Sequence, residues 1–166
     1  MKKCTFETSL GSLQIIVKEE FLVNCNWDEN ECHSKERMIE EKFTPTDETD
    51  KEKEVIEETI KQLSEYFEGR RKEFSLPLKF IGTDFQKKVW QAMLSVPYGS
   101  TVSYKQLAEK CGHPKAFRAV ANACGANPIS IITPCHRVCS SHGKIGGYTG
   151  GIDKKRWLLS IEGIKI

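Results

Sequence analysis

The sequence predicts an α+β fold in which a small N-terminal antiparallel sheet is followed by a mainly helical C-terminal part. Three short segments before residue 28 alternate apolar and polar residues, as strands buried on one face do. Beyond Thr83, helix-start signals and apolar stripes at helical spacing replace that alternation. With 166 residues the chain can form two small cores, and we expect domains over residues 1–79 and 80–166.

The N-terminal domain begins with three predicted strands, over residues 4–7, 13–18 and 21–27. Apolar residues of the third strand alternate with polar ones and are expected on one face, namely Phe21, Val23, Cys25 and Trp27. Residues 28–50 are polar and poorly patterned, which predicts a loop.

A helix is predicted next, over residues 51–68, with Gly69 at its end. Its apolar stripe consists of Val55, Ile56, Ile60, Leu63 and Phe67. Residues 74–80 include Pro77, so we expect an extended segment that links the two domains.

Two capping boxes mark helix starts in the C-terminal domain. Thr83 and Gln86 open a helix whose inward residues are Phe85, Val89, Trp90 and Met93. Ser103 and Gln106 repeat the signal, and Gly112 ends the helix that they open.

A further helix is expected from Pro114 through Arg118 to about Cys124. Two short helices joined at a glycine suggest a helix-turn-helix, with Lys115 and Arg118 on the recognition helix. Many such helical hairpins contact no DNA, so that alternative stays open. A last helix is predicted over residues 152–161.

The net charge of +2 conceals an asymmetry between the two parts of the chain. Residues 1–79 hold 13 Lys or Arg against 19 Asp or Glu, whereas residues 80–166 hold 12 against 4. A basic C-terminal part suits a polyanion such as DNA, although a solvated surface would have the same composition.

Composition also indicates the compartment. No apolar run is long enough to span a membrane, and the first residues lack the apolar stretch of a secretory signal. The 7 cysteines are odd in number and scattered, which argues against a disulfide framework. We expect a soluble, cytoplasmic protein that uses no membrane partner and keeps its thiols reduced.

Cys135 and His136 place a thiol next to an imidazole, just after the apolar, strand-like residues 129–132. A thiol with a pKa of roughly 8.5 needs a base or a nearby cation to be a good nucleophile at neutral pH. His136 could act directly or through a water, and Glu162, at the end of the last helix, could orient it. The alternatives are a core thiol and a solvated glutamate.

Several separated motifs then follow in a fixed order. They are Gly82 to Gln86 with Val89 and Trp90, Pro97 to Gly99 with Ser103 and Tyr104, Arg118 to Val120, Asn127 and Pro128, Pro134 to Val138, Gly147 to Gly151, and Leu158 and Leu159 with Glu162. In this order they resemble the O6-alkylguanine-DNA alkyltransferases, also called methylated-DNA-protein-cysteine methyltransferases. The N-terminal part is similar to the small sheet domain of that family in size and strand pattern.

This resemblance implies a ribonuclease H-like N-terminal domain and a winged helix-turn-helix-like C-terminal domain. The implied activity is DNA repair, by irreversible transfer of the alkyl group of O6-alkylguanine in duplex DNA to a cysteine of the protein after base flipping. O4-alkylthymine is a second candidate substrate. The resemblance implies no cofactor, and we expect a monomer of bacterial type that associates with the nucleoid when it binds DNA.

The resemblance also assigns catalytic roles. Cys135 would accept the alkyl group, His136 would take its proton through a water, and Glu162 would orient His136. Asn127 would brace the turn around the site. Tyr104 would donate toward N3 of the leaving guanine.

Other matching positions would bind DNA and the flipped base. Arg118 would enter the space that the base leaves, and the helix carrying Lys115, Arg118 and Ala119 would lie in the minor groove. The base pocket would be lined by the main chain at Cys135 and Val138, with Tyr148, Thr149 and Lys155. An exposed helix lysine is the alternative for Lys155.

Departures from the family pattern leave further alternatives. Ala121 and Cys124 replace the Gly and Asn common in bacterial members. A lesion-binding module without transfer and a helix-turn-helix regulator are competing functions; Cys135 favours transfer, and base-specific side chains are not evident. Some relatives bind zinc near the N-terminus, but Cys4, Cys25, Cys32 and His33 lack a Cys-x-x-Cys pair, so we expect no metal.

Overall fold

Three antiparallel strands in the order β1-β2-β3 form the N-terminal sheet. In the computed structural model, which describes residues 1–28 and 50–166, they are β1 (Lys2–Thr8), β2 (Gly11–Lys18) and β3 (Phe21–Trp27). All three predicted strands are confirmed. Most of the predicted loop, with Cys32 and His33, lies outside the described residues.

A β-bulge changes the expected alternation in β3. Val17 pairs with Leu22 and Ile16 with Asn24, so Val23 is the extra residue. A bulge shifts the alternation of a strand, so that the side chains before the extra residue are out of phase with those after it. As a result Leu22 is buried and Phe21 is exposed, whereas the prediction placed Phe21 on the inner face. Cys25 and Trp27 are buried as predicted.

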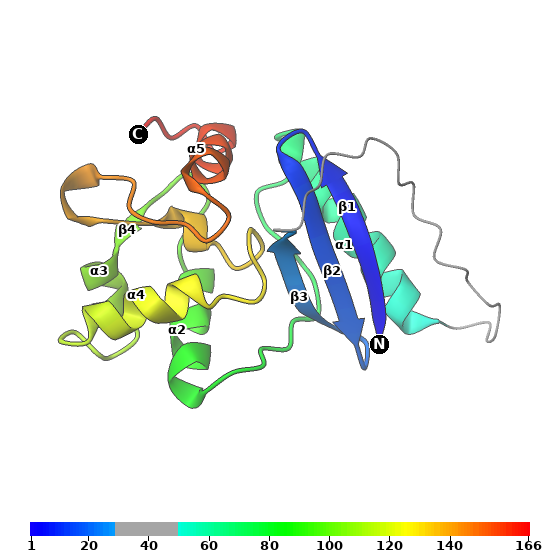
Figure 1. Cartoon of the computed structure of the whole chain (residues 1–166), viewed down its shortest axis with the longest axis horizontal. Coiled ribbons are helices and arrows are strands. Elements are labelled where there is room, and N and C mark those ends of the chain that lie inside the picture. The colour runs from blue at the N-terminus through cyan, green and yellow to red at the C-terminus, as the bar shows by residue number, and fades with distance from the viewer. Residues whose placement is uncertain (29–49) are drawn as a thin grey trace.

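Helix α1 (Lys51–Phe67) covers one face of the sheet (Figure 1). Asp50 caps its first turn by accepting from the amide of Lys53 at 3.2 Å. Ile56 and Leu63 are buried as the stripe predicts, and the polar residues Thr59, Gln62 and Tyr66 are buried with them. The hydroxyl of Tyr66 donates to Oε1 of Glu162 in the C-terminal half.

The extended segment after α1 continues the sheet before the chain enters the helical half. The Leu22 amide donates to the carbonyl of Pro77 at 2.8 Å, and the Lys79 amide donates to the carbonyl of Leu22 at 3.0 Å. Both predicted capping boxes are formed, at the starts of α2 (Asp84–Leu94) and α3 (Tyr104–Lys110). Trp90 ties α2 to α4 (Phe117–Gly125) by donating from its indole to the carbonyl of Ala123 at 2.8 Å.

Helix α4 (Phe117–Gly125) starts later than predicted. The amide of Ala116 donates to the carbonyl of His113 at 2.9 Å, so Pro114 lies in a turn before the helix. Proline suits the second position of such a turn because its φ is fixed there. The helix-turn-helix of α3 and α4 is present, with a longer connection than expected.

The remaining elements belong to the C-terminal half (Figure 1). They are the parallel pair β4 (Val102–Ser103) and β5 (Val138–Cys139), the 3-10 turn η1 (Cys135–Arg137), a second 3-10 turn, η2 (Ser141–Gly143), and α5 (Ile152–Ile161). Residues 129–132, expected to be strand-like, form only isolated bridges. None of the described helices has the length and apolar character needed to cross a membrane.

Candidate active site

Cys135 is half-buried at the start of η1, at the end of a loop that follows α4. Asn127 holds this loop: its Nδ2 donates to the carbonyl of Thr133 at 2.9 Å, and its Oδ1 accepts from the amide of Ile129 at 3.0 Å. The Cys135 amide donates to the same Thr133 carbonyl at 2.8 Å. Asn127 is therefore placed to brace the turn that carries the thiol.

The N-terminal half holds the other side of this loop. The backbone amide of Cys25 on β3 donates to the carbonyl of Pro128 at 2.8 Å, and the Cys25 carbonyl accepts from the amide of Ser130 at 2.7 Å. The hydroxyl of Ser130 donates to Oδ1 of Asn26 at 2.6 Å. Ile131 has a φ of 72°, a left-handed conformation that costs a β-branched residue about 1–3 kcal/mol. Contacts from both halves maintain this strained loop.

His136 is fully buried, and its Nε2 lies 2.7 Å from Oε1 of Glu162. A carboxylate only accepts hydrogen bonds, so Nε2 carries the hydrogen and Nδ1 keeps a lone pair. Nδ1 has no hydrogen-bond partner among residues 1–28 and 50–166. Burial lowers the pKa of His136, although its hydrogen bond to Glu162 opposes that effect. The imidazole is thus a neutral base next to the thiol in sequence.

The Glu162 carboxylate accepts hydrogen bonds from several directions. Arg137 donates from Nε and Nη2 at 2.9 to 3.2 Å, the Gly99 amide donates at 3.1 Å, and the Tyr66 hydroxyl donates at 2.7 Å. Burial alone would raise the pKa of Glu162, but the hydrogen bonds and charges of His136 and Arg137 hold it at about 2. Glu162 therefore remains ionised at any working pH.

Lys155 supplies a buried positive charge that interacts with the Cys135 thiol. Its Nζ donates to the carbonyls of Val138, at 2.6 Å, and Gly147, at 3.1 Å, and its side chain is 0% exposed. Burial raises the pKa of the Cys135 thiol, while hydrogen bonding to Asn127 and the charge of Lys155 oppose the increase. The alternative of an exposed helix lysine is wrong.

The residues predicted to surround the base lie on different elements, and Tyr104 and Tyr148 interact electrostatically with Cys135. Tyr104 is half-buried at the start of α3, and burial raises its pKa to about 12, so it stays a phenol. Tyr148 accepts from Nε1 of Trp27 at 3.1 Å. Thr149 donates to the carbonyl of Gly125 at 2.9 Å. The glycine-rich segment is therefore anchored both to β3 and to α4.

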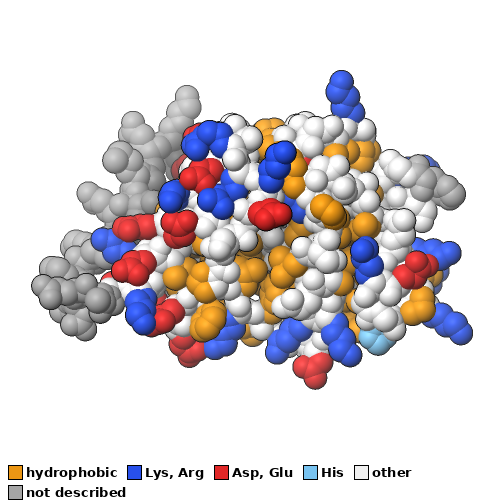
Figure 2. Space-filling model, turned by 180° about the vertical axis from the view of Figure 1, so that it is seen from behind, with side chains coloured by type: hydrophobic (Ala, Val, Ile, Leu, Met, Phe, Trp, Pro, Cys, Tyr) orange, Lys and Arg blue, Asp and Glu red, His pale blue; other side chains and the backbone are white. Residues whose placement is uncertain are grey.

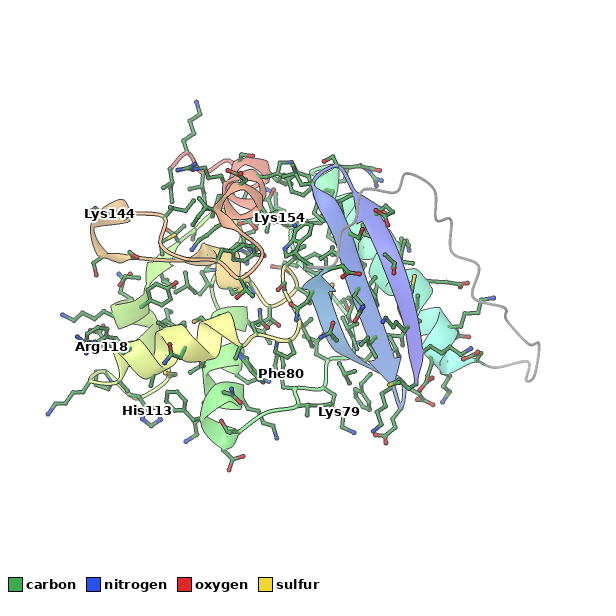
Figure 3. The ribbon with its side chains drawn as sticks, viewed as in Figure 1. Lys79, Phe80, His113, Arg118, Lys144 and Lys154 are labelled. Atoms are coloured by element: carbon green, nitrogen blue, oxygen red, sulfur yellow. The ribbon has the colours of Figure 1, made fainter. Side chains whose placement is uncertain are left out.

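The predicted DNA-contacting residues form an exposed surface at the N-terminal end of α4. Lys115, Arg118 and Ala119 are all exposed, and so is the large apolar side chain of Phe117, at 47%. Arg118 lies on the side of the C-terminal half remote from the sheet, near His113 (Figure 3). Acidic side chains in view gather over the N-terminal half, as the sequence asymmetry predicts (Figure 2).

Sequence reasoning missed two residues of the site. Tyr66 follows Leu63 by one helical turn, which predicts burial, but nothing local links it to Glu162. Arg137 lies in the motif from Pro134 to Val138, but the sequence predicted no role for it. Cys4 and Cys25 are buried in the sheet, and no three His, Cys, Asp or Glu side chains within the described ranges are grouped to hold a metal ion.

Family models match both halves of the chain. Residues 1–80 match the ribonuclease-like domain of 6-O-methylguanine DNA methyltransferase, and residues 84–164 match its DNA binding domain. A methylated-DNA-protein-cysteine methyltransferase of Methanosarcina acetivorans is 39% identical over 158 residues, which cover 95% of this chain and 96% of that relative. One from Mycobacterium bovis is 52% identical over 103 residues. That alignment covers 62% of each chain, which is less than two thirds of the relative.

Solved structures show the same fold over nearly the whole chain. The Mycobacterium tuberculosis OGT in complex with DNA superposes with a TM-score of 0.78 at 39% identity, covering 95% of this chain and 90% of that one. An O6-methylguanine DNA methyltransferase from Methanococcus jannaschii gives a TM-score of 0.63 at 26% identity, covering 98% and 95%. Both similarities extend across the two halves of the chain.

Proposed function

Because the chain belongs to the 6-O-methylguanine DNA methyltransferase family, we propose that it repairs alkylated DNA by moving the alkyl group of O6-alkylguanine onto Cys135. The observation that carries the proposal is the buried hydrogen bond between Glu162 and His136, the residue that directly follows Cys135 in the chain. His136 is a neutral base whose Nδ1 has no hydrogen-bond partner among the described residues, and Glu162 is an ionised orienting group.

The transfer is a displacement at the alkyl carbon. The Cys135 sulfur forms a new bond to that carbon as the bond to guanine O6 breaks. The electron pair of the broken bond stays with the guanine, and the guanine anion then takes up a proton from water to become guanine. A soft thiolate suits attack on an alkyl carbon, and the thioether product is not easily reversed. One protein molecule therefore repairs one lesion, and no cofactor is needed.

Proton transfers must accompany this displacement. His136 takes the thiol proton at Nδ1 through a water, while Glu162 holds the opposite ring nitrogen. Lys155 and Asn127 stabilise the thiolate that results. Tyr104, whose raised pKa keeps it protonated, donates a hydrogen bond to guanine N3 as negative charge develops on the base.

The target carbon lies inside the base stack, so the nucleotide must be flipped out at a cost of a few kcal/mol. Arg118 fills the vacated space, and Lys115 and Ala119 lie with it along the minor groove. Contacts there depend little on sequence, as repair at any position requires. The DNA complex of the Mycobacterium tuberculosis relative supports DNA as the partner.

The flipped base would be held between the two anchored segments around Cys135. Tyr148 and Thr149 would contact it from the glycine-rich segment, and the main chain at Val138 would contact it from β5. Lys155 supports this pocket by holding the carbonyls of Val138 and Gly147. O4-alkylthymine is a second candidate substrate for the same pocket. We further propose that the protein acts as a monomer in the cytoplasm.

Mass spectrometry tests the proposal directly. The protein is incubated with a duplex that contains one O6-methylguanine, and both the intact protein and its peptides are weighed. We expect one added methyl group on Cys135 and restored guanine in the duplex. Cys135→Ser should bind the duplex without gaining a methyl group, while Cys139→Ser, which removes a neighbouring buried thiol, should still be methylated. An unmodified wild-type protein that binds the lesion would instead indicate a lesion-binding module.

A further inference from the structure

A tyrosine from the N-terminal half reaches the buried network of the site. Tyr66 is 0% exposed on α1, and its hydroxyl donates to Oε1 of Glu162 at 2.7 Å. The same hydroxyl lies 3.4 Å from Nε2 of His136. We propose that Tyr66 is a positioning residue that sets the basicity of His136 through their shared carboxylate oxygen. This inference rests on the proposed function, because His136 is the base there.

Sharing one oxygen gives Tyr66 a defined electrostatic effect. Each hydrogen bond that Oε1 accepts withdraws some of the negative charge that would otherwise stabilise a protonated His136. Burial and the charge of Glu162 raise the pKa of Tyr66 far above its ordinary value, so the phenol keeps its proton and always donates. The hydroxyl therefore holds the pKa of His136 lower than Glu162 alone would.

Other charged or titratable groups lie around His136 and Glu162, but none of those described makes the neutral hydrogen bond that the Tyr66 hydroxyl donates to Glu162. Arg137 on η1 also donates to Oε1 but is a permanent cation. Lys155 on α5 donates to backbone carbonyls, and Tyr98 donates to the carbonyl of Ile161 at 3.0 Å. Cys135, next to His136 in the chain, is the proton donor of the proposed reaction.

Aromatic packing fixes the direction of the Tyr66 hydroxyl. The ring of Tyr66 lies 5.4 Å from that of Phe74 in the linking segment, and 6.2 Å, edge to face, from that of Tyr98 in the C-terminal half. Phe67 contacts it from α1 at 5.6 Å. Since these contacts involve the ring, Tyr66→Phe should keep the packing and lose only the hydrogen bond.

Removing the hydroxyl should change how the site responds to pH. With one donor fewer on Oε1, Glu162 stabilises protonated His136 more strongly, and the pKa of His136 rises. Neutral His136 is the active base, so the acid limb of the transfer rate should move to higher pH, by about half a pH unit for one neutral hydrogen bond. If Tyr66 had only a structural role, Tyr66→Phe would change the transfer rate by the same factor at every pH.

Thr59→Val provides a matched control. Thr59 is also fully buried on α1, and its hydroxyl donates to the carbonyl of Val55 at 2.6 Å, away from the site. Each variant removes one buried hydroxyl from the same helix. Melting temperatures of both variants show whether the fold is retained.

Two measurements on wild type, Tyr66→Phe and Thr59→Val test the inference. The first is an NMR titration of His136, which needs no DNA; the second is the single-turnover rate of methyl transfer as a function of pH. In Tyr66→Phe alone, we expect the midpoint of the His136 titration and the midpoint of the acid limb of the transfer rate to move to higher pH. Equal His136 midpoints in all three proteins would overturn the inference. Absence of transfer in wild type would refute the proposed function, while the titration would still decide the role of Tyr66.

Discussion

Trp27 in the N-terminal half donates a hydrogen bond from its indole Nε1 to the phenol oxygen of Tyr148, 3.1 Å away in the glycine-rich segment. Lys154 lies over the same indole ring, 4.8 Å from its centroid. Gly150 also packs against this ring, so that a Cβ built on it would lie 2.4 Å from Cδ1 of Trp27. The end of β3 therefore fixes one wall of the proposed base pocket.

Gly150→Ala should disturb that wall, because the added methyl group has no room beside Trp27. Overpacking of this kind costs about 1–3 kcal/mol, and we expect a lower melting temperature together with slower methyl transfer. Gly147→Ala is the control, since a Cβ there meets nothing within 4 Å. Equal transfer rates in the two variants would show that contact with Trp27 does not shape the pocket.

Lys155→Met should weaken both the fold and the reaction. The carbonyls of Val138 and Gly147 lose a buried charged donor, which costs about 1–3 kcal/mol, and the Cys135 thiol loses a nearby cation. The pKa of the thiol should rise further, so alkylation of Cys135 by iodoacetamide should slow near neutral pH. Peptide mass spectrometry separates Cys135 from the other thiols. Lys165→Met, at an exposed position, should react like wild type.

The elements governed by local sequence could be predicted well. The capping boxes at Thr83 and Ser103 formed as expected, because their hydrogen bonds lie within four residues of the chain. Helix α5 also has its predicted bounds. Where a nonlocal contact decided the outcome, prediction failed: the bulge at Val23 depends on pairing with β2, and it reversed the faces of Phe21 and Leu22.

The candidate site shows the same division. Cys135, His136 and Glu162 could be named from motifs, and the fold brings the last two within hydrogen-bonding distance. Tyr66 could not, because its role depends on how α1 docks against the C-terminal half. Burial of Lys155 was equally hidden, since a lysine between Lys154 and Arg156 has the local pattern of a solvated helix face.

Acid should destabilise the protein partly through Glu162. Its folded-state pKa of about 2 lies below the unfolded value of 4.5, so its contribution is present above about pH 5 and is lost as the pH falls toward 2. That contribution amounts to about 3 kcal/mol. Glu162→Gln should be less stable at pH 7, but its stability should fall less between pH 5 and pH 3 in urea titrations. Glu109→Gln, at an exposed carboxylate, should follow the wild-type slope; a wild-type slope for Glu162→Gln as well would contradict the assignment.

Phe117→Ala should weaken binding to duplex DNA while leaving stability nearly unchanged. Its ring is 47% exposed beside Arg118, where an apolar side chain can insert at a base step in the minor groove. We expect the Kd to rise by about 3- to 10-fold, similarly for different sequences, in fluorescence anisotropy titrations. Phe21→Ala removes an equally large side chain, 40% exposed, from the N-terminal half. If Phe21→Ala raised the Kd as much as Phe117→Ala, the DNA would not bind specifically at Phe117.

Arg118→Ala should slow methyl transfer only where a base has to leave the duplex. Without the guanidinium, the extruded state loses the group that fills the vacated space, and a loss of about 1–3 kcal/mol corresponds to a rate roughly 10- to 100-fold lower. The free base O6-methylguanine needs no extrusion, so we expect Arg118→Ala and wild type to transfer its methyl group to Cys135 at the same rate. Lys88→Ala, which removes an exposed charge from α2, should leave both rates unchanged. A similar decrease for duplex and free base would assign Arg118 to the reacting site itself, not to extrusion.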